Sequence, residues 1–301
     1  MTSFAHLAQR LFNTPLAIHP RKAEMVVAAL AERLGIASLV RMNGDTVILP
    51  SEAFYMDDND EGFGARRETR SDPGYDMIGD TGVALIKVSG TLVHKLGSLR
   101  PYSGMTGYDG LRQAHLTAIA DSSVRGIVHE IDSGGGEVAG CFDLVDAMFE
   151  TRGEKPVWAI LNESAYSAAY AIASAADRIV VPRTGGTGSI GVIAMHVDFS
   201  KALSANGFKV TFITSEGADR KTDGHGEIPL SPAAYDAFKV EIDEAGRLFD
   251  DTVARNRGLS SQAVNDLKAA TFMGANGLRT GLADAVMAPD AALRALLTEL
   301  A

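Results

Sequence analysis

From Val83 onward the sequence alternates between short apolar runs and helical patterns, and this alternation constrains the fold more than any other feature. The apolar runs occupy residues 83–93, 126–132, 157–161, 178–182, 189–198 and 209–215. The expected helices occupy residues 110–121, 138–150, 167–176, 199–206, 231–257 and 260–269. Near-continuous apolar strands separated by helices are typical of parallel βαβ units whose sheet is covered on both faces. The sequence therefore predicts an α/β fold built on a parallel sheet.

The residues before this region predict a small N-terminal appendage, 1–50. Apolar positions recur at helical spacing within 20–35, and 38–50 has the pattern of a strand pair around Asn43-Gly44. Residues 51–76 are rich in charge and glycine and have no strand or helix period, so we expect an exposed linker there. The main domain is then expected to span 77–288, followed by a C-terminal helix over 289–301.

Composition and charge exclude several classes of protein. The chain has 28 Lys and Arg against 38 Asp and Glu, a net charge of −10, so phosphate backbones and anionic membranes would repel it. No apolar stretch reaches the roughly 18 residues of a spanning helix, and the N-terminus lacks the apolar core of a signal peptide. The single cysteine, Cys141, cannot form an intramolecular disulfide or a C-x-x-C zinc site. We expect a cytoplasmic protein that binds neither nucleic acid nor membrane.

A glycine cluster, Gly134 to Gly136, stands directly after an expected strand and before an expected helix. Two interpretations stay open: a tight turn, or a site whose main-chain N–H groups face an anionic ligand atom. The spacing fits neither a dinucleotide-binding glycine motif nor a P-loop, so it does not predict a nucleotide site.

A serine, a second glycine turn and a lysine follow in order along the chain. Ser167 comes just after the apolar run 157–161, at the end of a parallel sheet, where open α/β folds build their sites. By itself its small-residue surroundings favour a packing face. The turn Thr187–Gly191 and the exposed-looking Lys221 are equally ambiguous alone.

Taken together, these features resemble the S49 serine peptidases, the signal peptide peptidase family. The matching segments are IDSGGG (131–136), YSAAY (166–170), SAADRIVV (174–181), TGSIGVI (187–193), Lys221 and GLRTGLADAV (277–286). A narrower resemblance, to the lambda-type phage capsid assembly proteases, lies in 90–111 and in the segment HLAQRLFNTPLAIHP (6–20). Two departures from the S49 pattern are Gly134, where the family has proline, and Ala168-Ala169, where it has Gly-Gly.

The resemblance implies the Clp peptidase and crotonase superhelix of repeated ββα units, and a serine endopeptidase with a Ser-Lys dyad. Ser167 would attack the scissile carbonyl, Lys221 would act as general base, and Ser189 would hold the lysine amine toward the serine. The oxyanion hole would consist of main-chain N–H groups, those of Gly135, Gly136 and Ala168. No cofactor or metal is expected.

The resemblance also implies protein substrates, namely scaffold, portal or other capsid proteins, and a homo-oligomeric ring working in the host cytoplasm or inside the procapsid. A rival assignment is a Ser-His-Asp triad with His196 and Asp198. On a strand these two side chains would be near neighbours on one face, so we favour lysine as the base.

Other histidines predict no chemistry of their own. His129 lies on an expected buried strand and fits a satisfied core residue, whereas His225 lies in the polar loop with Lys221. Two further function classes stay open: a crotonase-like acyl-CoA enzyme, and a non-catalytic capsid assembly factor with the same fold.

Overall fold

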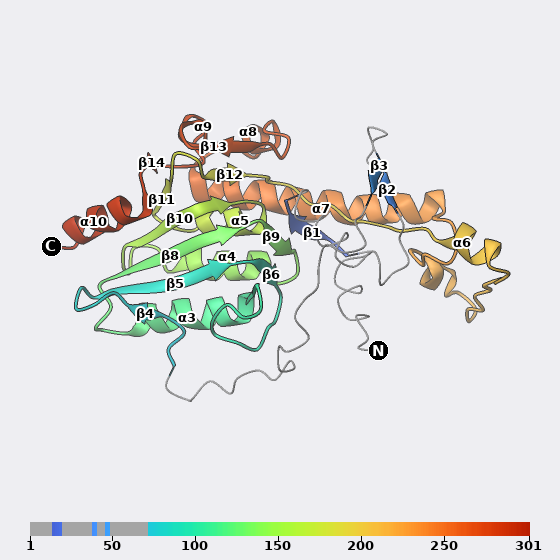
Figure 1. Ribbon diagram of the computed structural model, residues 1–301, viewed down its shortest axis with the longest axis horizontal. Helices are drawn as coiled ribbons and strands as arrows, with labels where there is room; N and C mark the ends of the chain where they lie inside the picture. Colours follow the sequence, from blue (N-terminus) through green and yellow to red (C-terminus); the bar gives the residue numbers. More distant parts are fainter. Residues whose placement is uncertain (1–13, 20–37, 41–45, 49–71) are drawn as a thin grey trace.

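The computed structural model describes residues 14–19, 38–40, 46–48 and 72–301 (Figure 1). The helix expected over 20–35 and most of the expected linker lie outside these residues. Strands β2 (Ser38–Val40) and β3 (Thr46–Ile48) pair antiparallel, which confirms the predicted strand pair. At the end of the expected linker, Tyr75 is buried and β4 (Asp76–Met77) joins the main body.

A large sheet forms the centre of the molecule and confirms the predicted α/β class. Its strands run in the order β13-β12-β10-β8-β5-β4, and β11 and β14 pair beside β10. They are β5 (Val83–Ser89), β8 (Gly126–Ser133), β10 (Val157–Ala165), β11 (Arg178–Val181), β12 (Gly186–Gly188), β13 (Thr271–Met273) and β14 (Ala285–Val286). The central pairs β5–β8, β8–β10 and β10–β11 are parallel.

A second, small sheet lies at one end of the large one, in the order β1-β9-β6-β7. It consists of β1 (Leu16–Ile18), β9 (Gly135–Glu137), β6 (Thr91–Val93) and β7 (Met105–Gly107). The chain passes from β5 in the large sheet to β6 and β7 in the small one, then to α3 (Tyr108–Ala120). The chain then follows the same path a second time, from β8 in the large sheet to β9 in the small one and on to α4 (Cys141–Glu150). The strand predicted over 83–93 is thus two strands in different sheets.

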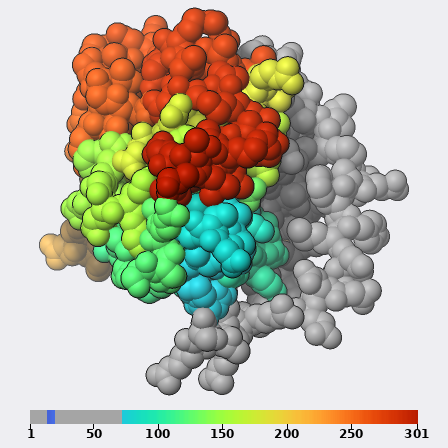
Figure 2. Space-filling view, turned by 90° about the vertical axis from the view of Figure 1, so that its left-hand side faces the viewer, coloured from blue at the N-terminus to red at the C-terminus, as the bar shows by residue number. Residues whose placement is uncertain are grey.

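Helices cover both faces of the large sheet. On one face α3, α4, α5 (Ala168–Ser174) and the end of α7 (Pro232–Arg257) share the main apolar core. On the other, α10 (Pro289–Glu299) places Ala292 and Leu296 against Val128 and Trp158. Figure 2 shows the C-terminal residues of α10, in dark red, on the surface of the molecule. The remaining helices are α6 (Ser200–Ala205), the 3-10 helix η1 (Asp219–Thr222), α8 (Ser261–Asn265) and α9 (Ala275–Arg279). None of the helices in the described part of the chain is both long and apolar enough to cross a membrane.

The long helix α7 belongs only partly to this body. Ser231 caps its start by accepting a hydrogen bond from the Ala234 N–H (3.1 Å), and Gly258 ends it in the left-handed conformation. Its C-terminal part buries Phe249 and Val253. Its N-terminal part extends away together with α6 (Figure 1). We call residues 199–245 the arm.

Two predicted strands are wrong. Residues 189–198 form no strand, apart from a single bridge between Ile193 and Leu16, and 209–215 form none either. Ile213 in the second run is 94% exposed. An apolar run becomes a strand only where a neighbouring chain segment pairs with its backbone, and within the described residues no strand pairs with 209–215. The helix predicted over 199–206 is present as α6.

Candidate functional site

Ser167 stands where the carboxyl ends of several strands meet. The Tyr166 N–H donates to the Ser133 carbonyl at the end of β8 (3.0 Å), and the Ser167 N–H donates to the Gly188 carbonyl at the end of β12 (2.9 Å). Helix α5 begins at the next residue. The predicted serine at a strand-to-helix junction is therefore present, at the edge of the sheet where open α/β folds place ligands.

The backbone of Ser167 is strained. Its φ of 56° and ψ of −124° lie in a region that side chains with a Cβ rarely adopt. Such a sharp turn between strand and helix projects the side chain of its central residue away from both elements. The Ser167 side chain is fully buried, and its hydroxyl has no hydrogen-bond partner among the residues that the structure describes. Strain and an unsatisfied buried hydroxyl together mark a functional position better than a packing face.

Gly135 lies directly against the serine. Its φ is +92°, and a Cβ added there would lie 2.9 Å from the Ser167 Cβ and 3.0 Å from the Ala168 nitrogen. The structure thus brings together the predicted nucleophile and two of the predicted oxyanion-hole residues. The Gly135 N–H donates to the Ser133 hydroxyl (3.1 Å). Gly136 is paired in the small sheet.

Ser189 belongs to the same cluster. It follows Gly188, the partner of the Ser167 N–H, and its own N–H donates to the Ala270 carbonyl (2.9 Å). Ser189 is buried and also has a positive φ, 55°. The second glycine turn therefore places a buried hydroxyl residue, with a strained backbone, beside the nucleophile position.

Lys221 is not brought to this cluster within the single chain. It lies in η1 with an exposed side chain, in the part of the arm far from α5 (Figure 1). The rival His196 and Asp198 lie in coil and not on the predicted strand. Asp198 accepts the Ser200 side-chain and backbone hydrogen bonds, which lower the pKa of its carboxyl group. His225 stacks on Phe212, with ring centroids 4.5 Å apart.

His129 is a buried core residue, as predicted, and it pairs with His115, but it is not fully satisfied because its Nδ1 has no hydrogen-bond partner among the described residues. The Nε2 of His129 lies 3.1 Å from the Nδ1 of His115, whose Nε2 lies 2.8 Å from the Thr151 hydroxyl. Burial lowers the pKa of His115 to about 4 and that of His129 well below its usual value. Among the described residues no cluster of three His, Cys, Asp or Glu side chains could hold a metal ion.

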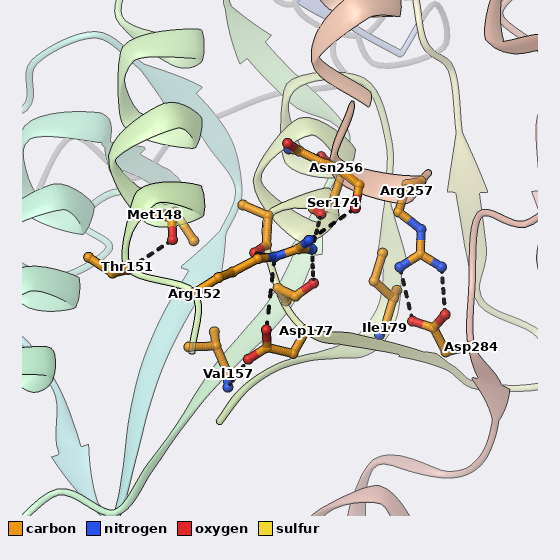
Figure 3. Close-up of polar contacts among 12 residues, drawn as sticks. Met148, Thr151, Arg152, Val157, Ser174, Asp177, Ile179, Asn256, Arg257 and Asp284 are labelled. Carbon is orange, nitrogen blue, oxygen red and sulfur yellow. Dashed lines mark hydrogen bonds and ion pairs between the residues drawn. The ribbon is translucent and has the colours of Figure 1, made fainter. Parts of the chain in front are cut away.

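The sequence analysis assigned no role to two aspartates of the matching motifs, and Figure 3 shows what they do. Asp177 accepts the Val157 N–H (2.8 Å). Asp284 accepts hydrogen bonds from the Ile179 N–H (2.7 Å) and from both terminal nitrogens of the Arg257 guanidinium group (2.6 and 3.0 Å). These carboxylates fasten β11 to its neighbours.

Arg152 and Asn256 complete this network around the C-terminal end of α5 (Figure 3). Arg152 donates to the carbonyls of Ser174 (3.0 Å) and Ala175 (2.9 Å), which end the helix. The Asn256 side chain donates to the Ser174 hydroxyl (2.9 Å). The network holds α5, and thereby Ser167 at its start, against the end of α7.

Comparison with known proteins agrees with the resemblance seen in the sequence motifs. The profile of peptidase family S49 matches residues 150–301. The chain is 38% identical over 298 residues, 99% of its length, to the head-tail preconnector protein GP5 of Enterobacteria phage P21. It is 37% identical over 287 residues, 94% of its length, to the capsid assembly protease C of Escherichia phage lambda.

A more distant relative is protease 4 of Haemophilus influenzae, 27% identical over 208 residues, which are 68% of this chain and 32% of that protein. The chain covers 58% of the phage P21 protein and 63% of the phage lambda protein. The family profile includes Ser167 and the turn 187–191, and the two long phage alignments also include the glycine cluster 134–136. The chain belongs to peptidase family S49.

Proposed function

We propose that this protein is a serine endopeptidase that cleaves scaffold, portal or other capsid proteins during phage procapsid maturation. The observation that carries the proposal is the strained, buried Ser167, set at a strand-to-helix junction against Gly135 and the Ala168 N–H. The name of the phage lambda relative, a capsid assembly protease, supports the choice of substrates. The reaction belongs in the host cytoplasm or inside the procapsid.

In this mechanism the Ser167 Oγ attacks the scissile carbonyl while its proton passes to the Lys221 amine, and main-chain N–H groups bind the developing oxyanion. The C–N bond then breaks, Lys221 protonates the leaving amine, and water hydrolyses the acyl-enzyme to release Ser167. The Ala168 N–H, at the start of α5, is the best placed of these, because the helix dipole adds partial positive charge there. Loss of one such donor typically costs about 3 kcal/mol of transition-state stabilisation.

The general base is Lys221 of a second copy of the chain. A base must come within hydrogen-bond reach of the serine hydroxyl, and Lys221 lies on an arm that extends away from its own Ser167. Assembly into a ring would bring the arm of one copy over the site of the next and remove the ammonium group from water, which favours the neutral amine. Ser189 would then hold that amine toward Ser167.

We also propose that this α/β fold is the superhelix of Clp peptidases and crotonases. Its support is the repeated passage from a strand of the large sheet, through the small sheet, to a helix, seen at β5–α3 and again at β8–α4.

The test is co-expression with the scaffold and portal proteins of the same phage, followed by mass spectrometry of the fragments. Ser167→Ala and Lys221→Ala should each abolish cleavage, whereas Lys209→Ala, a matched exposed lysine of the arm, should not. A Ser167→Ala chain mixed with a Lys221→Ala chain should recover part of the activity, because some sites then contain both intact residues.

Two outcomes would contradict separate parts of the proposal. Cleavage that persists in Ser167→Ala would remove the peptidase assignment. Loss in both single variants without recovery in the mixture would place the base in the same copy. Fluorophosphonate labelling that depends on Ser167 argues against a purely structural assembly factor.

A further inference from the structure

Strand β1 lies beside the candidate site and is hydrogen-bonded along both edges. On one edge Leu16, Ala17 and Ile18 pair antiparallel with Glu137, Gly136 and Gly135. The ladder continues beyond β1, from the His19 N–H to the Gly134 carbonyl (2.7 Å). On the other edge Leu16 and Ile193 exchange two backbone hydrogen bonds of 2.8 and 2.9 Å.

The carbonyl of Ala17 lies at the nucleophile. A Cβ added to Gly135 would lie 2.2 Å from the Ala17 carbonyl oxygen, while the same point is 2.9 Å from the Ser167 Cβ and 3.0 Å from the Ala168 nitrogen. The peptide oxygen, the serine and the helix N–H therefore converge on one point beside Gly135, so closely that no side-chain atom fits there. This is where a scissile carbonyl would have to lie for Ser167 to attack it.

We propose that residues 15–19 are an internal ligand of the peptide-binding site, which we define as 134–138 together with Ile193. This inference rests on the proposed peptidase function. In it, a substrate binds as an extended strand in the place that β1 occupies. The site excludes outside peptides until this segment leaves.

The segment also indicates which peptides fit. Ala17 is fully buried, with its carbonyl toward Ser167, and Leu16 and Ile18 are almost fully buried on either side. A large side chain in place of Ala17 would meet the main apolar core, of which Ala17 is a member. The site therefore takes an extended peptide with a small residue facing the serine and aliphatic residues next to it.

Backbone pairing on both sides of Ala17 makes the segment a competitor for the site. Because it is covalently attached, its effective concentration is on the order of millimolar, so a free peptide of equal intrinsic affinity binds poorly until the segment is displaced.

A reversible crosslink tests whether the segment must move. Leu16 and Glu137 face each other across the antiparallel pair, which brings two cysteines close enough for a disulfide. The variant is the full chain with Leu16→Cys, Glu137→Cys and Ser167→Ala. The native thiol does not interfere, because Cys141 is fully buried and burial raises its pKa to about 12. Glu137→Cys alone, in the same background, is the control.

The readout is the binding of a fluorescein-labelled peptide with the sequence of residues 13–20, followed by fluorescence anisotropy. The reduced protein should bind it weakly, in competition with the attached segment, and the oxidised protein should not bind it, with recovery on adding dithiothreitol. An Ala17→Lys, Ser167→Ala protein should bind it about ten-fold or more tightly than Ser167→Ala alone, because a buried ammonium group expels the segment. The same peptide carrying lysine in place of its alanine should bind none of them.

Equal binding to the oxidised and reduced forms would overturn the inference, as would no binding to either form or failure of the crosslink to form. If Ala17→Lys does not fold, the oxidised and reduced comparison still decides. These measurements need no catalysis. A chain that binds the peptide in the expected order but cleaves no protein would refute the peptidase and leave the internal ligand in place.

Discussion

At Gly135 backbone conformation and close packing impose the same requirement. The residue has a φ of +92°, and a Cβ there would lie against both Ser167 and Ala17. Glycine is the residue that tolerates such a φ without cost, and it places no Cβ against Ser167. A side chain at this position would collide with the Ala17 carbonyl oxygen and crowd the predicted nucleophile.

Gly135→Ala should therefore abolish fluorophosphonate labelling of Ser167 in the assembled protein. The matched control is Gly153→Ala, because Gly153 has a similar φ of +87° but no atom within 4 Å of its added Cβ. That variant should lose about 1–2 kcal/mol of unfolding free energy from backbone strain and keep its labelling. Equal labelling in the two variants would show that contact at Gly135 does not matter.

At the scale of elements, a chain of hydrogen bonds joins α3, β8 and the end of α4. The Thr151 hydroxyl donates to the Met148 carbonyl (2.8 Å), so the His115 Nε2–H donates to Thr151 and the His129 Nε2–H donates to the His115 Nδ1. The Nδ1 of His129 is left as a buried acceptor without a partner in the described part of the chain. A proton added there would be buried with nothing to accept it, so the folded protein holds both rings neutral.

The unfolding free energy should consequently fall as pH drops from 7 toward 4. In this window the unfolded histidines, with pKa values near 6.5, take up protons that the folded rings do not, at up to about 1.4 kcal/mol per pH unit for each ring. The lowered pKa of His115, about 4, sets the lower end of the window. Urea unfolding at several pH values should show a smaller dependence of the unfolding free energy on pH in His115→Gln than in the wild type. Identical slopes in the wild type and His115→Gln would refute this.

The contact between Arg257 and Asp284 fastens the end of α7 to β11 and β14. The Arg257 side chain is only 8% exposed, and Asp284 also accepts the Ile179 N–H. Asp284→Asn would leave the guanidinium group without its counter-charge, and we expect a loss of about 2–3 kcal/mol of unfolding free energy. Asp290→Asn removes the exposed pair with Arg294 and should cost about 0.5 kcal/mol or less. Similar losses of unfolding free energy in the two variants, measured by urea unfolding, would show that burial of the Arg257–Asp284 pair does not add to stability.

At the scale of the whole molecule, the arm leaves apolar side chains in water that a folded body would ordinarily bury. Val240 and Tyr235 on α7 are more than half exposed, and so is Phe208. These exposed apolar groups are the surface that the proposed assembly would cover.

Val240→Asp should therefore weaken assembly, and cleavage should fall in step with it. Light scattering and the co-expression assay measure the two quantities on the same preparation. Glu244→Lys changes charge on the same helix without removing apolar surface and should assemble normally. A fully active monomer would exclude a base supplied by a second copy.

Much of the architecture follows from the sequence by itself. Apolar runs and small-residue stretches fix most strands and helices locally, so the parallel α/β class, the site of Ser167 and the helix over 199–206 could be predicted. The strands predicted from the apolar runs 189–198 and 209–215 were wrong, because strand formation depends on a pairing partner that no local pattern reveals. The place of Lys221 relative to Ser167 could not be predicted either, since it depends on where the arm points.

The tertiary structure alone decided the features that connect distant residues. The φ angles of Ser167 and Ser189, the carboxylate bridges of Asp177 and Asp284, and the insertion of Leu16–Ile18 beside Gly135 each require segments far apart in the chain to meet. Local propensity carries no information about such meetings, because their free energy comes from burial and hydrogen bonding between elements that only the complete fold brings together.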